Sequence, residues 1–312
     1  TIPLFNKSIF SEIEDFRAEV LKYHYPEVKN YGDFTKIKKE DIGEETDVLV
    51  GGTPCATFSI AGLRKGLDED RGNLALEFIK LVERINPTWV IWENVFGVLS
   101  SNKGEDFATF LGALAELGYG FAYRVLDAQY FGVPQRRRRV FVVGCADGDW
   151  RSASAVLFDK KSLCGNLASS KTEKQGSSLF SQGSVGSESR ELGRGIGFSH
   201  TQGLDCQPST KHFPTLRAEG NGMAVSIPSK HIVRRLSPIE CERLQGFPDN
   251  YTQIPWKGRP AEECPSSHRY KALGNSMAVP VMKWIGMRID MLDSADISGR
   301  GKSKTTKQMT LW

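Results

Sequence analysis

The stretch that most restricts the fold of this 312-residue chain is residues 51–59, Gly-Gly-Thr-Pro-Cys-Ala-Thr-Phe-Ser. It follows residues 47–50, Asp-Val-Leu-Val, an apolar run typical of a buried parallel strand. A strand that ends in two glycines and a proline must turn sharply, which leaves Cys55 on a loop at the carboxyl end of the sheet. In open α/β sheets, ligands bind at that edge. The pattern predicts an α/β protein with a nucleophilic thiolate at Cys55, and the alternative is a buried structural cysteine.

Further polar residues adjoin other predicted strands. Residues 89–92, Trp-Val-Ile-Trp, form a buried strand that delivers Glu93 to the same edge. A partly desolvated carboxylic acid there could donate a proton; the alternative is a surface Glu that caps the next loop. Four arginines precede the strand at residues 140–143, and Arg137 and Arg139 share one face of it. Two guanidiniums suit a phosphate, a carboxylate or a pyrimidine carbonyl, whereas the alternative is a solvated strand end.

The first predicted strand, residues 9–10, is followed by Glu12. An acid at the end of a second Rossmann strand commonly accepts the hydroxyls of a ribose, and the alternative is an acidic helix start favoured by the helix dipole. Asp33 and Phe34 offer a polar and an aromatic contact to an adenine.

The composition is that of an ordinary soluble globular protein, with 39% apolar and 25% charged residues. A formal charge of +4 is too small to indicate a polyanion partner by itself, so only the clustering of arginines points to phosphate. Six cysteines without a C-x-x-C pair and five histidines without H-E-x-x-H give no expectation of a metal site or a disulfide framework. Without a signal peptide or a membrane-spanning run, we expect a cytoplasmic location.

Four segments follow from the pattern along the chain. Strands and helices alternate over residues 1–146, and residues 147–265 include a Ser/Gly-rich stretch typical of a smaller, irregular domain. Within it, Ser237-Pro-Ile-Glu240 is a capping box that predicts a helix start. Residues 266–292 end in a helix that returns to the first domain, and the basic tail, residues 293–312, is expected to lack regular structure.

Taken in series, the motifs resemble the DNA methyltransferases that methylate carbon 5 of cytosine. The matches occur in the family's order between residues 11 and 286. They are Pro54-Cys55, Glu93-Asn94-Val95, Gln135-x-Arg137-x-Arg139, Arg235-Leu-Ser-Pro238 with Gln245-Gly-Phe-Pro248, and Gly274-Asn-Ser276. The resemblance implies a Rossmann-like, S-adenosylmethionine-dependent sheet at residues 1–146 and a target-recognition domain at residues 147–265.

The resemblance also assigns roles to residues. Cys55 would add to carbon 6 of a flipped-out cytosine in a specific DNA sequence. Glu93 would protonate ring nitrogen 3 and Arg139 would bind carbonyl oxygen 2, while Arg137 would support the site. Cofactor contacts would fall on Glu12, Asp33, Phe34, Pro54, Leu74, Asn275 and Ser276, and DNA contacts on Ser59, Arg136, Thr215 and Leu216. The expected cofactor is S-adenosylmethionine without a metal. The expected partner is double-stranded DNA bound by a monomer, with a cognate restriction endonuclease as a functional companion.

Two departures from the family matter. Ala56 stands where the family has Gln, which affects a DNA contact and not the covalent chemistry. The Phe-x-Gly-x-Gly turn that cradles the cofactor's methionine is absent from the sequence. We therefore expect one strand and one helix to be missing before residues 9–10, a gap in the sheet beside them, and weak cofactor binding.

Three other functions remain open from the sequence. A transfer-RNA cytosine-5 methyltransferase would use the same catalytic residues. A DNA-binding relative that lost catalysis with the glycine-rich turn would not need Cys55, Glu93 and Arg139 together. A thiol hydrolase would need a histidine near Cys55, and His24 is on a helix remote from the loop.

Overall fold

The structure is a computed structural model that describes residues 7–42, 46–53, 74–158, 196–199, 213, 223–227, 232–296 and 307–311. The chain forms two compact units. The first comprises Thr1–Leu126, Arg139–Gly165 and Lys283–Trp312, and the second comprises Asp127–Arg138 and Asn166–Met282. The second unit thus includes residues 127–138, which the sequence-based boundary at 146 assigns to the catalytic domain. The backbone explains this, because Phe213 N donates to Pro134 O at 2.8 Å and Arg136 N donates to Phe213 O at 2.7 Å.

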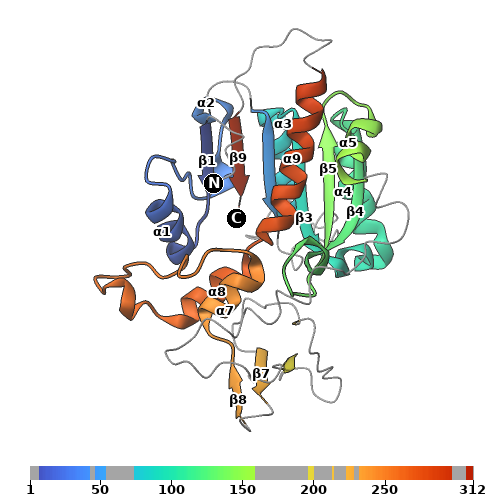
Figure 1. Cartoon of the computed structure of the whole chain (residues 1–312). Coiled ribbons are helices and arrows are strands. Elements are labelled where there is room, and N and C mark those ends of the chain that lie inside the picture. Colours follow the sequence, from blue (N-terminus) through green and yellow to red (C-terminus); the bar gives the residue numbers. More distant parts are fainter. Residues whose placement is uncertain are drawn as a thin grey trace. The chain divides into compact units, whose positions relative to one another are not determined.

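A six-stranded sheet forms the centre of the first unit, in the order β1-β9-β2-β3-β5-β4 (Figure 1). The strands β1, β9, β2 and β3 are parallel, and β5 is antiparallel to β3. This confirms the α/β fold class. The bounds are β1 (Lys7–Ser11), β2 (Val48–Gly52), β3 (Trp89–Val95), β4 (Gly120–Asp127), β5 (Arg138–Cys145) and β9 (Lys307–Leu311).

The expected gap beside β1 is not present, because β9 lies between β1 and β2 (Figure 1). Ile9 is opposite Met309 on that side. On the other side, Phe10 forms a parallel bridge with Asn30. The prediction of an unpaired side at residues 9–10 is therefore wrong, and so is the expectation that residues 307–311 lack regular structure. A short polar tail carries no strand pattern of its own, but pairing with two neighbouring strands satisfies its backbone groups.

Helices cover the sheet of the first unit, with α9 in front of it and α3 behind it in Figure 1. Two side-chain contacts fix α9, whose residues from Lys283 onward belong to this unit. Trp89 Nε1 on β3 donates to Asp293 Oδ1 at 3.0 Å, and Arg288 Nε donates to Val156 O on α5 at 2.5 Å. The bounds are α1 (Asp15–His24), α2 (Lys39–Ile42), α3 (Leu74–Ile85), α4 (Glu105–Glu116), α5 (Trp150–Leu157) and α9 (Val279–Asp296), with the 3-10 turns η1 (Phe34–Lys36), η4 (Phe96–Leu99) and η5 (Ser101–Gly104).

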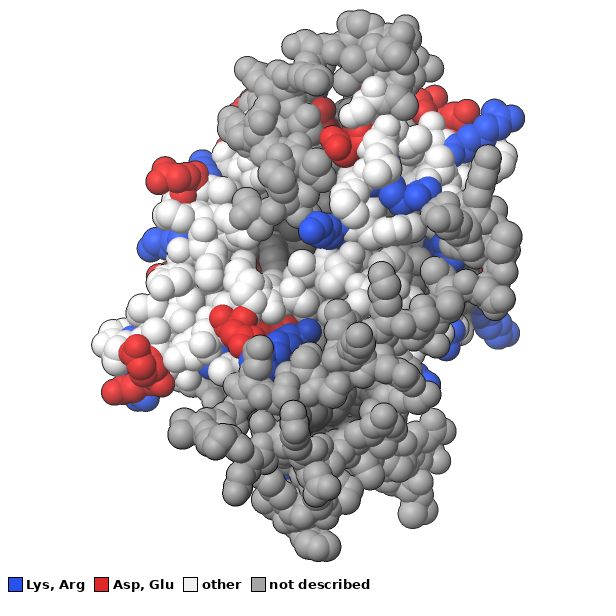
Figure 2. Space-filling view, in the orientation of Figure 1, with Lys and Arg blue, Asp and Glu red and all other residues white. Residues whose placement is uncertain are grey.

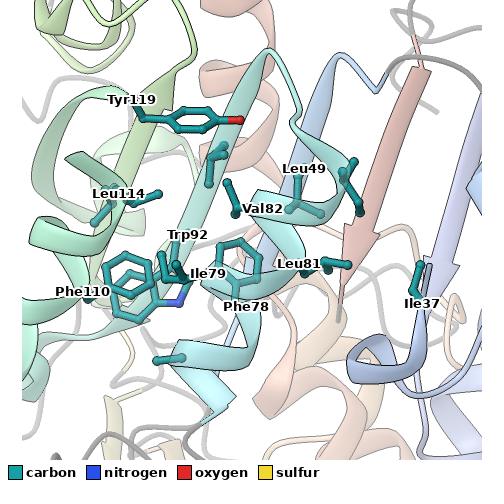
Figure 3. Packing of buried hydrophobic residues seen from close by; sticks show 14 of the residues in the cluster. Ile37, Leu49, Phe78, Ile79, Leu81, Val82, Trp92, Phe110, Leu114 and Tyr119 are labelled. Atoms are coloured by element: carbon teal, nitrogen blue, oxygen red, sulfur yellow. The ribbon is translucent and has the colours of Figure 1, made fainter. Parts of the chain in front are cut away.

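The core behind the sheet anchors the strands that carry the candidate site. Leu49 on β2 and Trp92 on β3 point to the same side, where they meet Phe78 from α3 and Phe110 from α4 (Figure 3). The rings of Trp92 and Phe110 stack with their centroids 4.2 Å apart. Burial of each such side chain contributes about 1.5–3 kcal/mol, so β2 and β3 are held in fixed register by their apolar face.

The second unit contains a three-stranded antiparallel sheet and two helices. The sheet has the order β6-β7-β8, with β6 (Ile196–Ser199), β7 (Met223–Ile227) and β8 (Ile232–Arg235). The helices are α7 (Pro238–Gln245) and α8 (Ser266–Asn275), with the 3-10 turns η6 (Ala128–Phe131) and η9 (Ala261–Glu263). The predicted capping box of α7 is confirmed, since Ser237 Oγ accepts from Glu240 N at 3.3 Å and Glu240 Oε2 accepts from Ser237 N at 2.7 Å. In the described part of the chain, no helix has the length and apolarity needed to cross a membrane.

Candidate active site

Four strand ends of the first unit meet at one edge of its sheet. Because β1, β2 and β3 are parallel, their carboxyl ends lie at the same edge, and the antiparallel β5 brings its amino end there. Glu12 follows β1, Thr53 follows β2, Glu93 lies near the end of β3, and Arg139 lies at the start of β5. The edge therefore gathers two carboxylic acids and a guanidinium from separate strands, as ligand sites in open α/β sheets do.

Glu93 and Arg139 form an ion pair at this edge. Glu93 Oε1 lies 3.1 Å from Arg139 Nε, and the two side chains are 12% and 14% exposed. The strand register explains the contact: Val95 is opposite Arg139 and Glu93 is opposite Phe141, so the acid and the guanidinium are diagonal neighbours on one face. The small exposed fractions leave both groups accessible to a ligand while most of each side chain is held by the protein.

Glu12 is held in one orientation by its neighbours. Arg17 Nη2 donates to Glu12 Oε1 at 2.9 Å, and Arg17 Nε lies 2.8 Å from Glu12 Oε2. Glu14 N also donates to Oε1, at 2.8 Å. The amide of Asn30 bonds the backbone N–H and the carbonyl of Glu12, each at 2.9 Å. Glu12 Oε2 accepts no hydrogen bond from the described residues beyond its ion contact, so it keeps acceptor capacity for a hydroxyl group.

The next predicted cofactor residues have structural partners within the first unit. Asp33 caps η1 by accepting hydrogen bonds from Thr35 N at 3.0 Å and Thr35 Oγ1 at 2.7 Å. Burial acts to raise the pKa of Asp33, but the hydrogen bonds from Thr35 outweigh it and the pKa lies below the ordinary value. Phe34 packs partly buried against the core, and Leu74 is the first residue of α3.

In the second unit, Arg137 holds the turn after α8. Its Nη2 donates to Ser276 O at 2.8 Å, and its Nη1 lies 3.4 Å from Gly274 O. Ser276 is 1% exposed, and its hydroxyl donates to Leu273 O at 2.8 Å, whereas Asn275 is exposed. Arg137 thus binds carbonyl groups at a helix end, and Arg139 contacts Glu93.

Several predicted residues are not covered by this geometry. Cys55, Pro54, Ser59, Thr215 and Leu216 lie outside the described residues. The last candidate DNA contact, Arg136, is described, and its side chain is exposed in the second unit.

Sequence reasoning gave no role to three residues at the junction of β2 and the segment that follows it. Asn94 and Trp92 on β3 both hydrogen-bond Thr53. Asn94 lies inside the recognised Glu-Asn-Val motif, and a carboxamide two residues after the buried apolar run 89–92 was the available signal.

Charge is mixed on the face of the molecule that Figure 2 shows. Among the described residues of that face, acidic and basic side chains are interspersed. The formal charge of +4 arises from 41 basic and 37 acidic residues, which agrees with this near balance.

The structure has a Rossmann-like α/β fold with a candidate site at the carboxyl edge of its sheet. Comparison with solved structures agrees with this fold. The Dnmt2 methyltransferase of S. pombe superposes with a TM-score of 0.62, at 14% identity, over 92% of this chain and 100% of that one.

Sequence comparison identifies the family. The family model described as C-5 cytosine-specific DNA methylase matches residues 4–290. The Type II methyltransferase M1.ScrFI of Lactococcus lactis subsp. cremoris is 33% identical over 297 residues, which cover 91% of this chain and 72% of that protein. A DNA N-6-adenine-methyltransferase of Escherichia phage P1 is 32% identical, but its match spans 90% of this chain and only 57% of the phage protein. The chain belongs to the C-5 cytosine-specific DNA methylase family.

Proposed function

We propose that this chain transfers a methyl group from S-adenosylmethionine to carbon 5 of a flipped-out cytosine in a specific sequence of double-stranded DNA, through a covalent bond to Cys55. The observation that carries the proposal is the Glu93–Arg139 pair, 3.1 Å apart, at the sheet edge where β2 leads into the segment with Cys55. An acid and a guanidinium side by side match the ring nitrogen 3 and the carbonyl oxygen 2 of cytosine, which are also adjacent.

The chemistry explains why both groups are needed. Carbon 5 of cytosine is a poor nucleophile, so the Cys55 thiolate first forms a bond to carbon 6. The electron pair displaced from the 5,6 double bond makes carbon 5 nucleophilic, while Glu93 protonates ring nitrogen 3 and Arg139 stabilises the charge on oxygen 2. S-Adenosylmethionine, when bound, supplies the methyl group as an electrophilic carbon. Loss of the carbon 5 proton then restores the double bond and expels the thiolate of Cys55.

The residues at the end of β1 fit the nucleoside part of that cofactor. Glu12 presents a fixed, buried carboxylate with an oxygen that accepts no hydrogen bond from the described residues, which suits a ribose hydroxyl. The sequence contains no Phe-x-Gly-x-Gly turn for the methionine part. The proposal therefore assigns Glu12 to the ribose, with Asp33 and Phe34 toward the adenine.

The base must leave the duplex before any of these groups can reach it. Flipping costs a few kcal/mol, which contacts to the DNA have to offset. We assign these contacts to Ser59, Arg136, Thr215 and Leu216, and the choice of DNA sequence to the target-recognition domain at residues 147–265.

The test is incubation of the protein with S-adenosylmethionine and duplex DNA in which 5-fluorocytosine replaces cytosine in all short sequence contexts. Fluorine at carbon 5 cannot leave as a proton does, so the covalent intermediate accumulates. We expect a denaturation-resistant adduct that maps to Cys55 and is lost in Cys55→Ser. Cys264→Ser is the matched control, because Cys264 is a buried thiol in the second unit and should leave the adduct intact.

Two outcomes would overturn the proposal. One is the absence of an adduct from protein that binds S-adenosylmethionine. The other is methylation of adenine, the base in the name of the phage P1 relative, that survives Cys55→Ser, because attack by an exocyclic amine needs no thiolate. Adduct formation with transfer RNA and not with DNA would move the substrate to RNA while keeping the chemistry.

A further inference from the structure

Two side chains of β3 form hydrogen bonds to Thr53, the residue that follows β2. The backbone ladder of these strands ends where Gly52 is opposite Glu93. Thr53 lies one residue further and is 6% exposed. Asn94 Nδ2 donates to Thr53 O at 2.9 Å, and Trp92 Nε1 donates to Thr53 Oγ1 at 3.2 Å. The strand pairing is thus extended by side chains beyond the point where the backbone ladder stops.

The sequence explains why side chains take over at this point. Pro54 has no backbone N–H, so the residue after Thr53 cannot donate to a neighbouring strand. Thr53 is two residues before Cys55, so the position of its carbonyl group determines where the following segment starts.

The side chains of Asn94 and Trp92 are themselves held in place by their surroundings. Asn94 is 3% exposed, and its Oδ1 accepts from Val95 N at 2.8 Å while its Nδ2 donates to Thr53. Trp92 is fully buried, with its ring stacked on Phe110. Neither side chain can move away from Thr53 without losing buried hydrogen bonds or core packing.

We propose that Asn94 and Trp92 are positioning residues, which set the start of the Cys55 segment relative to the Glu93–Arg139 pair. Side chains alternate along β3, so the strand presents Glu93 on one face and uses Asn94 and Trp92 on the other to hold Thr53. The strand β3 therefore fixes both the position of Glu93 and the position of Thr53, from which the chain continues to Cys55. This inference rests on the proposed function, in which sulfur and acid act on the same base.

The main test is Asn94→Asp, which keeps the size of the side chain and the acceptor for Val95 N but removes the donor to Thr53 O. Since a misplacement of 1 Å costs on the order of 100-fold in rate, we expect adduct formation with 5-fluorocytosine DNA to slow about 100-fold in single turnover. Affinity for S-adenosylmethionine should stay unchanged. Asn86→Asp is the matched control, because it makes the same charge change at an exposed position before β3 and should react as wild type does.

A second pair of variants keeps the inference testable if Asn94→Asp does not fold. Trp92→Phe and Thr53→Val each remove the hydrogen bond between Trp92 Nε1 and Thr53 Oγ1, and Thr53→Val does so at nearly constant volume. If the bond positions the segment, each variant slows adduct formation and the double variant is no slower than the slower single one. A purely structural role would lower the unfolding midpoint and leave the adduct rate of the folded protein unchanged.

The outcomes separate the two proposals. If Asn94→Asp forms the adduct at the wild-type rate, the positioning role is overturned and the proposed function stays intact. If Asn94→Asp does not fold, a wild-type rate in both Trp92→Phe and Thr53→Val has the same meaning. Failure of the wild-type protein to form any adduct overturns the proposed function itself.

Discussion

Replacement of Glu242 by Gln tests how much one buried carboxylate contributes to the second unit. Glu242 is fully buried, and its oxygens accept hydrogen bonds from Asn250 N at 2.7 Å, from Thr252 N at 2.8 Å and from Arg269 Nη2 at 3.0 Å. Arg269 is itself only 6% exposed. A carboxylate satisfies all of these donors because it only accepts, whereas a carboxamide presents two N–H groups to a site lined by donors.

The magnitude follows from the loss of one partner in a buried ion pair. Such a change typically costs about 3–5 kcal/mol, because the remaining charge stays buried without compensation. In Glu242→Gln the guanidinium of Arg269 is left in that position, although it keeps its hydrogen bond to Thr252 Oγ1 at 3.0 Å. We therefore expect the free energy of unfolding of this unit to fall by about 3–5 kcal/mol.

Urea unfolding measures the loss, and hydrogen exchange of the peptide at residues 247–253 locates it. The amides of Asn250 and Thr252, which donate to Glu242, should lose protection first. Glu262→Gln is the control, since Glu262 is exposed on η9 and its replacement should change stability by less than about 0.5 kcal/mol. A decrease below about 1 kcal/mol in Glu242→Gln, with unchanged exchange at these amides, would refute the reasoning.

Three further predictions concern pH, backbone conformation and catalysis. Burial acts to raise the pKa of Glu240, but hydrogen bonds from Arg234 outweigh it and lower the pKa below the ordinary 4.5. The ionised acid therefore stabilises the fold above that pH, and this contribution is lost as the pH falls through the folded pKa. In urea titrations at a series of pH values, the stability difference between wild type and Glu240→Gln should be largest near neutrality and vanish in acid. Gly246 has φ +83°, and an added Cβ would lie 2.6 Å from Cδ of Pro280. Gly246→Ala should therefore lower the free energy of unfolding by more than the roughly 1–2 kcal/mol of the left-handed conformation alone, and an unchanged free energy of unfolding in urea would contradict this. Glu93→Gln should reduce kcat by about 10²–10⁴ while DNA binding persists, and full activity in a methyl-transfer assay would exclude it as the acid.

The strand ends of the first unit could be predicted from the sequence because their signals are local. The apolar runs before Gly51 and Glu93 are short, continuous and bounded by polar or glycine residues, which fixes both strands and their ends. The proximity of Glu93 and Arg139 needs one further fact, which is that β5 runs antiparallel to β3 and so brings its amino end to the edge where β3 ends. The capping box at Ser237 was predictable for the same reason, since its hydrogen bonds span three residues.

The contacts that could not be predicted join distant parts of the chain. The pairing of β9 with β1 connects residues 300 positions apart, and the five-residue sequence of β9 is too short to give a clear strand signal. Arg137 binds the carbonyls of Gly274 and Ser276, which are distant in the sequence, and alternation along one strand cannot reveal such contacts. The hydrogen bond of Asn94 to Thr53 likewise depends on the register between two strands.

The most direct measurement is the structure of the protein trapped on 5-fluorocytosine DNA in the presence of S-adenosylmethionine. The account predicts one extruded cytosine ring with Sγ of Cys55 bonded to carbon 6, the carboxyl group of Glu93 at ring nitrogen 3, and the guanidinium of Arg139 at oxygen 2. A trapped base that contacts neither Glu93 nor Arg139, or a covalent bond to a residue other than Cys55, would contradict it.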